Sequence, residues 1–210
     1  MFVTLLSTGC ARIPSGVNLV STKDKHAFAE KYPAAYISRG SGGDYHVILL
    51  KDGVSDSSPA KPGAPIRPLA LADVRQVLHI HIFWAPMRGA KPDNPSATNA
   101  AIDWYLVRAG ADGAVTGLAH YEGAGLVTAS IADDAAGIIV RSGNLTPKTV
   151  AGDITDPIGP SRITARFDAV HKDSAVTDIL AQLDHLQQPG LPADSLDAAR
   201  LTEPAASARN

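Results

Sequence analysis

The chain has 210 residues, with 19 Lys and Arg against 21 Asp and Glu and a net charge of −2 at neutral pH. This balance contains no basic block, so nucleic acid is not an expected partner. No apolar run after residue 10 approaches the roughly 18 residues of a membrane-spanning helix, and the single cysteine excludes an internal disulfide or a cysteine-based zinc site.

The first ten residues carry the clearest pattern of the chain. The apolar run that starts at Phe2 leads into Leu6-Ser7-Thr8-Gly9-Cys10, which resembles the lipobox of bacterial lipoproteins. The resemblance implies that Cys10 is acylated, and that a lipid anchor holds the protein on a membrane of the bacterial cell envelope, facing the periplasm or the exterior. Because no basic residue precedes the apolar run, residues 1–32 are expected to be a truncated leader and tether. The alternative is a short edge strand followed by a buried Cys10.

Between this leader and residue 86 the pattern changes several times. A weak helical patch covers Asp24 to Lys31, and the β-branched and aromatic residues from Tyr45 to Leu50 predict a strand. Residues 55–68 contain four Pro, which predicts an extended linker. A strongly apolar strand is then expected from Val77 to Trp84, and Pro86 should end it.

The second half predicts further strands at short spacing. They are expected over 102–107, 114–122, 125–131, 137–141 and 162–170. An amphipathic helix should begin with Ser174 as its N-cap and carry an apolar stripe of Val176, Ile179, Leu180, Leu183 and Leu186. Residues 187–210 lack periodicity and are expected to be a disordered tail.

This order of elements predicts a mainly β fold. Many antiparallel strands without βαβ alternation indicate a sandwich or barrel, with one C-terminal amphipathic helix. Residues 33–186 should form a single β-rich domain. The architecture by itself implies no function.

Strand register predicts one cluster of metal-ligand types. Side chains alternate along a strand, so His79 and His81 share a face, as do Asp103 and Tyr105. If Asp112-Gly113 forms a two-residue turn, Tyr105 lies opposite His120 and Asp103 lies opposite Glu122. The candidate divalent-metal ligands are therefore His79, His81, His120, Glu122 and Asp103. The alternative is a half-exposed polar face, or hydrogen-bonded histidines that line a barrel. His81 and His120 would lie about 9 to 10 Å apart across the intervening strand, so a shared ion requires strong sheet curvature.

The long loop from Ala85 to Ala100 is a second candidate, for contact with a ligand or a partner. The candidate contact residues are Arg88, Lys91, Asp93 and Asn94 in this loop, together with Trp84, Trp104 and Tyr105 outside it. The chain carries no nucleophile elbow, phosphate-binding loop or His-Glu-x-x-His motif, so no reaction is predicted.

Three functions of different classes follow. The first is a lipid-anchored envelope protein whose β-domain binds a small ligand or a protein. The second is a metal-binding protein or metal-dependent enzyme that uses the His-x-His strand. The third is a structural subunit of an envelope assembly, which predicts an exposed apolar patch and self-association.

Overall fold

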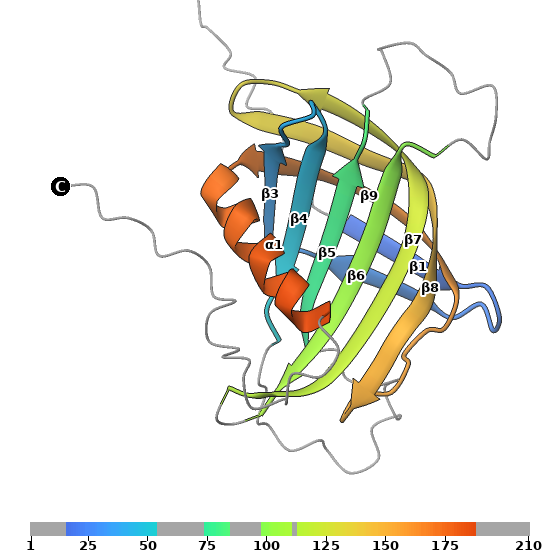
Figure 1. Cartoon of the computed structure of the whole chain (residues 1–210). Helices are drawn as coiled ribbons and strands as arrows, with labels where there is room; N and C mark the ends of the chain where they lie inside the picture. Colours follow the sequence, from blue (N-terminus) through green and yellow to red (C-terminus); the bar gives the residue numbers. More distant parts are fainter. Residues whose placement is uncertain (1–15, 54–73, 85–97, 111–112, 188–210) are drawn as a thin grey trace, which may run out of the picture.

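A curved sheet of nine strands makes up most of the protein (Figure 1). The structure is a computed structural model that describes residues 16–53, 74–84, 98–110 and 113–187. Its elements are β1 Gly16–Ser21, β2 Ala27–Lys31, β3 Ala34–Arg39, β4 Tyr45–Lys51, β5 Arg75–Ile82, β6 Ala100–Ala109, β7 Val115–Ile131, β8 Ala135–Gly152, β9 Ser161–His171 and α1 Asp173–Gln187. The predicted fold class, mainly β with one C-terminal helix, is confirmed for the described part of the chain.

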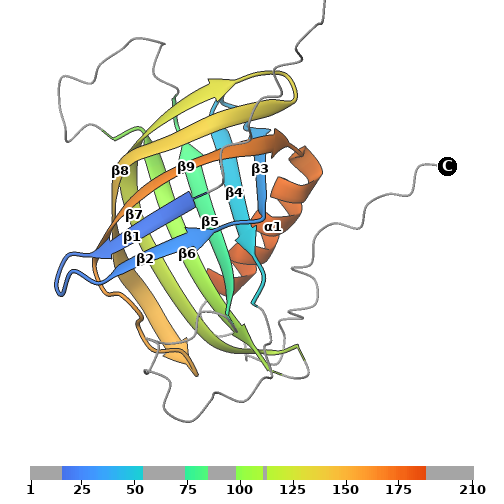
Figure 2. The ribbon, with the colours of Figure 1, turned by 180° about the vertical axis from the view of Figure 1, so that it is seen from behind.

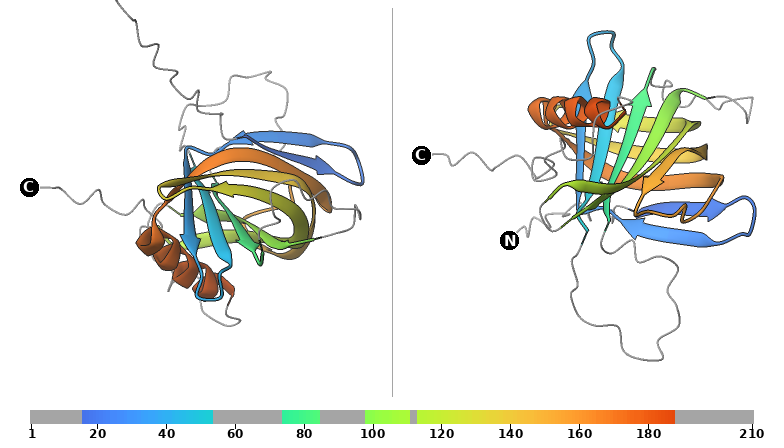
Figure 3. Two further views of the ribbon diagram at one scale, coloured as in Figure 1. Left: turned by 90° about the horizontal axis from the view of Figure 1, so that it is seen from above. Right: turned by 60° about the horizontal axis from the view of Figure 1, so that its bottom comes forward.

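Pairing between the first and last strands of the series closes the curved sheet. Strands β3 to β8 follow one another in the sheet, β8 also pairs with β9, and β9 pairs with β3, so the sheet curls round (Figure 3, left). The β1–β2 hairpin attaches to the first half of β9 and lies in front of the other strands in Figure 2. One pairing differs from the antiparallel expectation: β3 runs parallel to β9, at Tyr36 with Val170 and Ile37 with His171.

The inner face of the curled sheet forms the main core. Alternation along β5 sends Leu78, Ile80 and Ile82 inward, where all three are fully buried. The predicted dry face of β9 is confirmed in the same way, because Ile163 and Phe167 are buried in this core. Burying a side chain of this size stabilises a fold by about 1.5 to 3 kcal/mol.

The helix α1 lies on the outer face of β3 and β4 (Figure 1). The predicted stripe faces the sheet: Val176, Ile179 and Leu183 are buried against a second apolar cluster that includes Ile48 and Val77. The helix starts at Asp173, one residue before the predicted N-cap. No helical segment in the described ranges has the length and apolar character of a membrane span.

The predicted weak helix at 24–31 is wrong. Ala27–Lys31 is strand β2, in which Phe28 and Glu30 are half-buried while the alternate residues are exposed. Pairing with β1 decides the conformation of this short segment, because local propensity is too weak to form an isolated helix. The β-domain therefore includes residues before 33, starting at Gly16 among the described residues. Gln187, expected to begin the tail, is the last residue of α1. Cys10 and the rest of the predicted tail lie outside the described ranges.

Strands β7 and β8 are longer than predicted. The two strands expected at 114–122 and 125–131 are one strand, and the strand expected at 137–141 extends to Gly152. Gly123 does not break β7; it allows a close approach, since a Cβ there would lie 1.7 Å from the carbonyl oxygen of Asn144. The pairing of β7 with β8 shifts register twice, between His120 and Tyr121 and between Leu126 and Val127.

Candidate metal centre

A row of histidines and aspartates crosses the outer face of β4 to β7. On β5, His79 and His81 point away from the inner core, on the same face as the helix-covered Val77. Their neighbours across the strands are set by register: His46 of β4 lies opposite His81, and Asp103 of β6 lies opposite His79. The titratable side chains of four strands thus form one continuous row, which we call the histidine row. It consists of Asp44, His46, His79, His81, Asp103 and His120.

The predicted pairing across the β6–β7 hairpin is confirmed. Tyr105 lies opposite His120 and Asp103 lies opposite Glu122. The turn itself differs from the predicted two-residue type, because the amide of Gly110 donates to the carbonyl of Ala114. A register shift after Arg108 then restores the expected pairing further along the strands.

One end of the row brings together three ligand atoms. Asp44 Oδ2 lies 2.5 Å from His81 Nε2 and 3.5 Å from His46 Nε2, and one ligand atom from each residue lies within 4.8 Å of the others. The rings of His46 and His81 stack with centroids 4.2 Å apart. All three side chains are 21 to 28% exposed, so an ion in solution can reach them. We call this group the Asp44 triad.

The β3–β4 turn positions the carboxylate of this triad. The amide of Gly40 donates to the carbonyl of Asp44 over 2.9 Å, and Gly43 has a φ of +85°, which a glycine adopts without strain. A Cβ at position 40 would lie 2.2 Å from Asp44 Oδ1. Glycine at 40 therefore leaves the space that the carboxylate occupies beside the histidines.

The other end of the row is built around Asp103. His120 Nε2 donates to Asp103 Oδ1 over 2.9 Å, and His79 Nδ1 lies 3.7 Å from Asp103 Oδ2. Tyr105 stacks on the His120 ring with centroids 4.2 Å apart and an interplanar angle of 7°. Burial alone would raise the pKa of Asp103, but the hydrogen bonds from His120 and His79 outweigh it and hold the pKa of that carboxyl well below its usual value.

The two ends are joined by one contact between imidazoles. His46 Nδ1 lies 3.1 Å from His79 Nε2, so one of these two nitrogens donates to the other. Burial, together with the neighbouring His81 and His79, lowers the pKa of His46, which favours its neutral form. A hydrogen bond from His81 lowers the pKa of Asp44. A carboxylate beside a neutral imidazole is the protonation state that a metal ion requires.

In their neutral forms, His46 and His79 together carry one proton fewer than hydrogen bonds in all of their contacts would need. His46 faces Asp44 and His79 faces Asp103, while the two rings face each other. A hydrogen bond in each of these three contacts would need one proton, but two neutral imidazoles carry only two. Without a third positive charge, a ring nitrogen lone pair must face a carboxylate oxygen. A proton or a metal cation at one end of the pair removes this repulsion.

The structure divides the predicted ligands into separate groups. His81 belongs to the Asp44 triad, whereas His79, Asp103 and His120 form the other end of the row. Glu122 is not in the row, because it pairs with Lys148. The sequence did not predict Asp44 and His46 as part of the site. His46 alternates along β4 with Val47 and Leu49, which face the main core, and the pairing of β4 with β5 brings it to His81.

The predicted contact loop is only partly described. Trp84 is 53% exposed at the end of β5, while Arg88, Lys91, Asp93 and Asn94 lie outside the described residues. Trp104 and Tyr105 are strand residues of β6 and are buried, so neither forms part of an exposed loop. Alternation sends Trp104 into the inner core and Tyr105 under the helix. Their contact with a ligand or a partner stays a prediction.

Comparison of the chain with protein-family models, with curated proteins and with solved structures yields no match.

Proposed function

We propose that the protein binds a divalent transition-metal ion of the zinc class through Asp44, His46 and His81. The observation that carries this proposal is the convergence of two imidazole nitrogens and one carboxylate oxygen within 4.8 Å. The 3.5 Å between His46 Nε2 and Asp44 Oδ2 is close to the roughly 3.4 Å that separates two ligands of a tetrahedral zinc ion with bonds of about 2.1 Å. His81 Nε2 moves away from the carboxylate by about 1 Å to reach the same geometry.

The proton count supports a cation at this end of the row. A metal on His46 Nε2 leaves the proton on His46 Nδ1, which then donates to His79 Nε2. His79 keeps its remaining proton on Nδ1, where it faces Asp103. Ligating histidines typically donate their second nitrogen in this way, which fixes the ring and its tautomer. The row thus supplies both ligands and the residues that orient them.

The donor set leaves room for a further ligand. Three protein ligands occupy three positions of a tetrahedral zinc ion, so one position stays open to water or another molecule. Two histidines and one carboxylate also form the ligand set of open iron sites. The proposed role is therefore to bind an exchangeable metal ion that carries a small molecule as an additional ligand.

Zinc titration by calorimetry on the full, chelator-treated chain tests this function. We expect one ion per chain and a loss of affinity of at least 10-fold in His81→Ala. The matched control is His26→Ala, because His26 follows Asp24 with the spacing of the triad and lies 3.8 Å from it, but is not part of the three-residue group. A wild type that takes up no zinc, or an equal loss in both variants, would contradict the proposal.

We also propose a lipid anchor at Cys10, which the lipobox-like segment at residues 6–10 supports. The metal-binding domain would then lie in the bacterial cell envelope, attached to a membrane through its N-terminus. Metabolic labelling with a fatty acid, in cells that carry the natural upstream sequence, is expected to label the wild type but not Cys10→Ser. An unlabelled wild type would contradict the proposed anchor and would not affect the metal proposal.

Participation in an envelope assembly stays a prediction. Phe83 and Trp84 directly follow β5, and each is 53% exposed, so they provide a small apolar surface. Elution of the chain as a dimer or larger species in size-exclusion chromatography would support self-association, and a strictly monomeric chain would count against it.

A further inference from the structure

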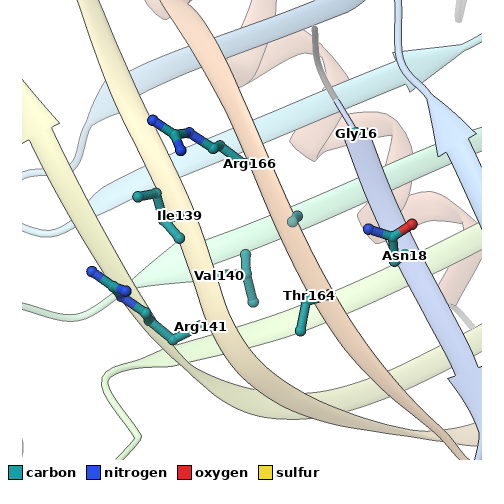
Figure 4. Close-up of a pocket in the computed structure, with 8 residues that line it drawn as sticks. Gly16, Asn18, Ile139, Val140, Arg141, Thr164 and Arg166 are labelled. Carbon is teal, nitrogen blue, oxygen red and sulfur yellow. The ribbon is translucent and has the colours of Figure 1, made fainter. Parts of the chain in front are cut away.

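A second polar site lies on the outer face of β1, β8 and β9, away from the histidine row. Arg141 of β8 and Arg166 of β9 line a groove of about 450 Å³ (Figure 4). Register places Arg166 opposite Ile139, so the two arginines are close neighbours on adjacent strands. In Figure 4 both side chains extend from the strands on the same side, with Ile139 between them. We call this site the arginine groove.

The arginines of the groove have no acidic ion-pair partner among the described residues. The described residues that line the groove include no Asp or Glu. Guanidinium groups stay protonated at any physiological pH. The groove therefore holds two permanent positive charges that the described part of the chain leaves unneutralised.

The remaining lining is suited to an anion of moderate size. The side chains of Val140 and Ala165 are buried in the main core, whereas Asn18 and Thr164 are exposed and offer uncharged hydrogen-bonding groups to the groove. Gly16 has no side chain to fill the space at the edge of β1. Arginine donates in a planar fork that matches carboxylate and phosphate oxygens. A single carboxylate is satisfied by one such fork, whereas the additional oxygens of a phosphate group can accept from two.

We propose that the arginine groove binds a phosphate group through Arg141 and Arg166. This proposal stands independently of the metal centre, because the two sites share no residue. The phosphate can belong to a free phosphate ion or to the headgroup of an anionic lipid, and the recognition chemistry is the same. The second source rests on the proposed lipid anchor: Gly16 follows Cys10 by six residues, which span at most about 20 Å. An anchored Cys10 thus keeps the groove within reach of a bilayer surface.

The experiment uses the full chain, inorganic phosphate, and vesicles of phosphatidylglycerol or phosphatidylcholine. The test variant combines Arg141→Gln with Arg166→Gln. The control combines Arg39→Gln with Arg162→Gln, which removes the same charge from two exposed arginines outside the groove. All four side chains are exposed, and circular dichroism before titration verifies that both variants fold.

We expect the test variant to bind phosphate at least 10-fold more weakly than the wild type, while the control keeps wild-type affinity. Binding of inorganic phosphate without vesicle binding assigns the groove to free phosphate. Binding of phosphatidylglycerol vesicles but not phosphatidylcholine vesicles, lost in the test variant alone, assigns it to lipid headgroups. Absence of binding to every probe, or an equal loss in test and control variants, overturns the proposal. Failure of Cys10 to take up lipid does not affect the phosphate measurement.

Discussion

The outer face of β4, β5 and β6 has two halves with opposite chemistry. Under α1, the outward residues are apolar: Ile48, Val77 and Tyr105 are buried against the helix. Two residues further along the same strands, the outward positions carry His46, His79 and Asp103, which stay partly exposed. Backbone geometry is the same in both halves, and the difference is whether a helix covers the face. The helix-covered half is built for stability, and the histidine row is free to bind a ligand.

The largest effect of a substitution on stability is expected in the helix-covered half. Ile179→Ala should lower the free energy of unfolding by about 2 to 5 kcal/mol, because Ile179 is only 4% exposed between helix and sheet. Urea denaturation measures it, with the exposed Thr177→Ala as a control that changes stability by at most about 0.5 kcal/mol. Zinc affinity of the folded variant should stay unchanged. A parallel loss of zinc affinity would show that the two halves are not independent.

A substitution in the histidine row should change zinc affinity, unlike a substitution under the helix. His79→Ala is expected to weaken zinc binding by about 10- to 100-fold, because it removes the acceptor for His46 Nδ1 but none of the three ligands. Calorimetry should still find one ion per chain, which separates this positioning residue from the ligand His81. Unchanged affinity would mean that the contact between the two rings does not orient His46.

Asp103 is expected to make the free energy of unfolding depend on pH. Its pKa is lowered in the folded protein, so its stabilising effect is complete above its unfolded pKa of about 3.9 and declines as the pH falls below that value. Asp103→Asn should cost about 1 to 3 kcal/mol of unfolding free energy at pH 7, since His120 and His79 lose a charged acceptor. The difference in unfolding free energy between wild type and variant should be smaller by about 1 kcal/mol at pH 3 than at pH 7. Urea titrations at the two pH values measure it, and a constant difference would contradict the assigned role.

The smallest effect is expected at Glu122, beyond the end of the row. Its ion pair with Lys148 joins two half-exposed side chains, and such surface pairs contribute at most about 1 kcal/mol. Glu122→Gln should therefore change stability by less than that, with a smaller change in high salt. Zinc affinity should be unaffected. A clear loss of zinc affinity would indicate that Glu122 is a metal ligand, as the sequence predicted.

Local patterns predicted much of the row. Alternation separated His79 and His81 from Leu78 and Ile80, because one face of the strand had to be buried. The short β6–β7 connection then brought His120 opposite Tyr105, since neighbouring strands joined by a tight turn must pair. These inferences needed only residues that lie close together in the chain.

The Asp44 triad could not be found in this way. Residues 52–74 separate β4 from β5, and a connection of that length does not determine whether the two strands are neighbours or in which register they pair. Asp44 reaches the site only because the β3–β4 turn folds back beside Gly40. The weak β2 pattern failed for a related reason: pairing with β1, which nothing in residues 24–31 specifies, decides its conformation.

The amino-acid sequence by itself determined the mainly β character, the faces of β5, β6 and β9, and the apolar stripe of α1, because these depend on periods of two and of about 3.6 residues. Tertiary structure alone decided which distant strands became neighbours. It brought β4 beside β5, which created the Asp44 triad, and it brought β8 and β1 to opposite edges of β9, which created the arginine groove. Such pairings depend on how the whole sheet closes around its core, and no local pattern encodes that closure.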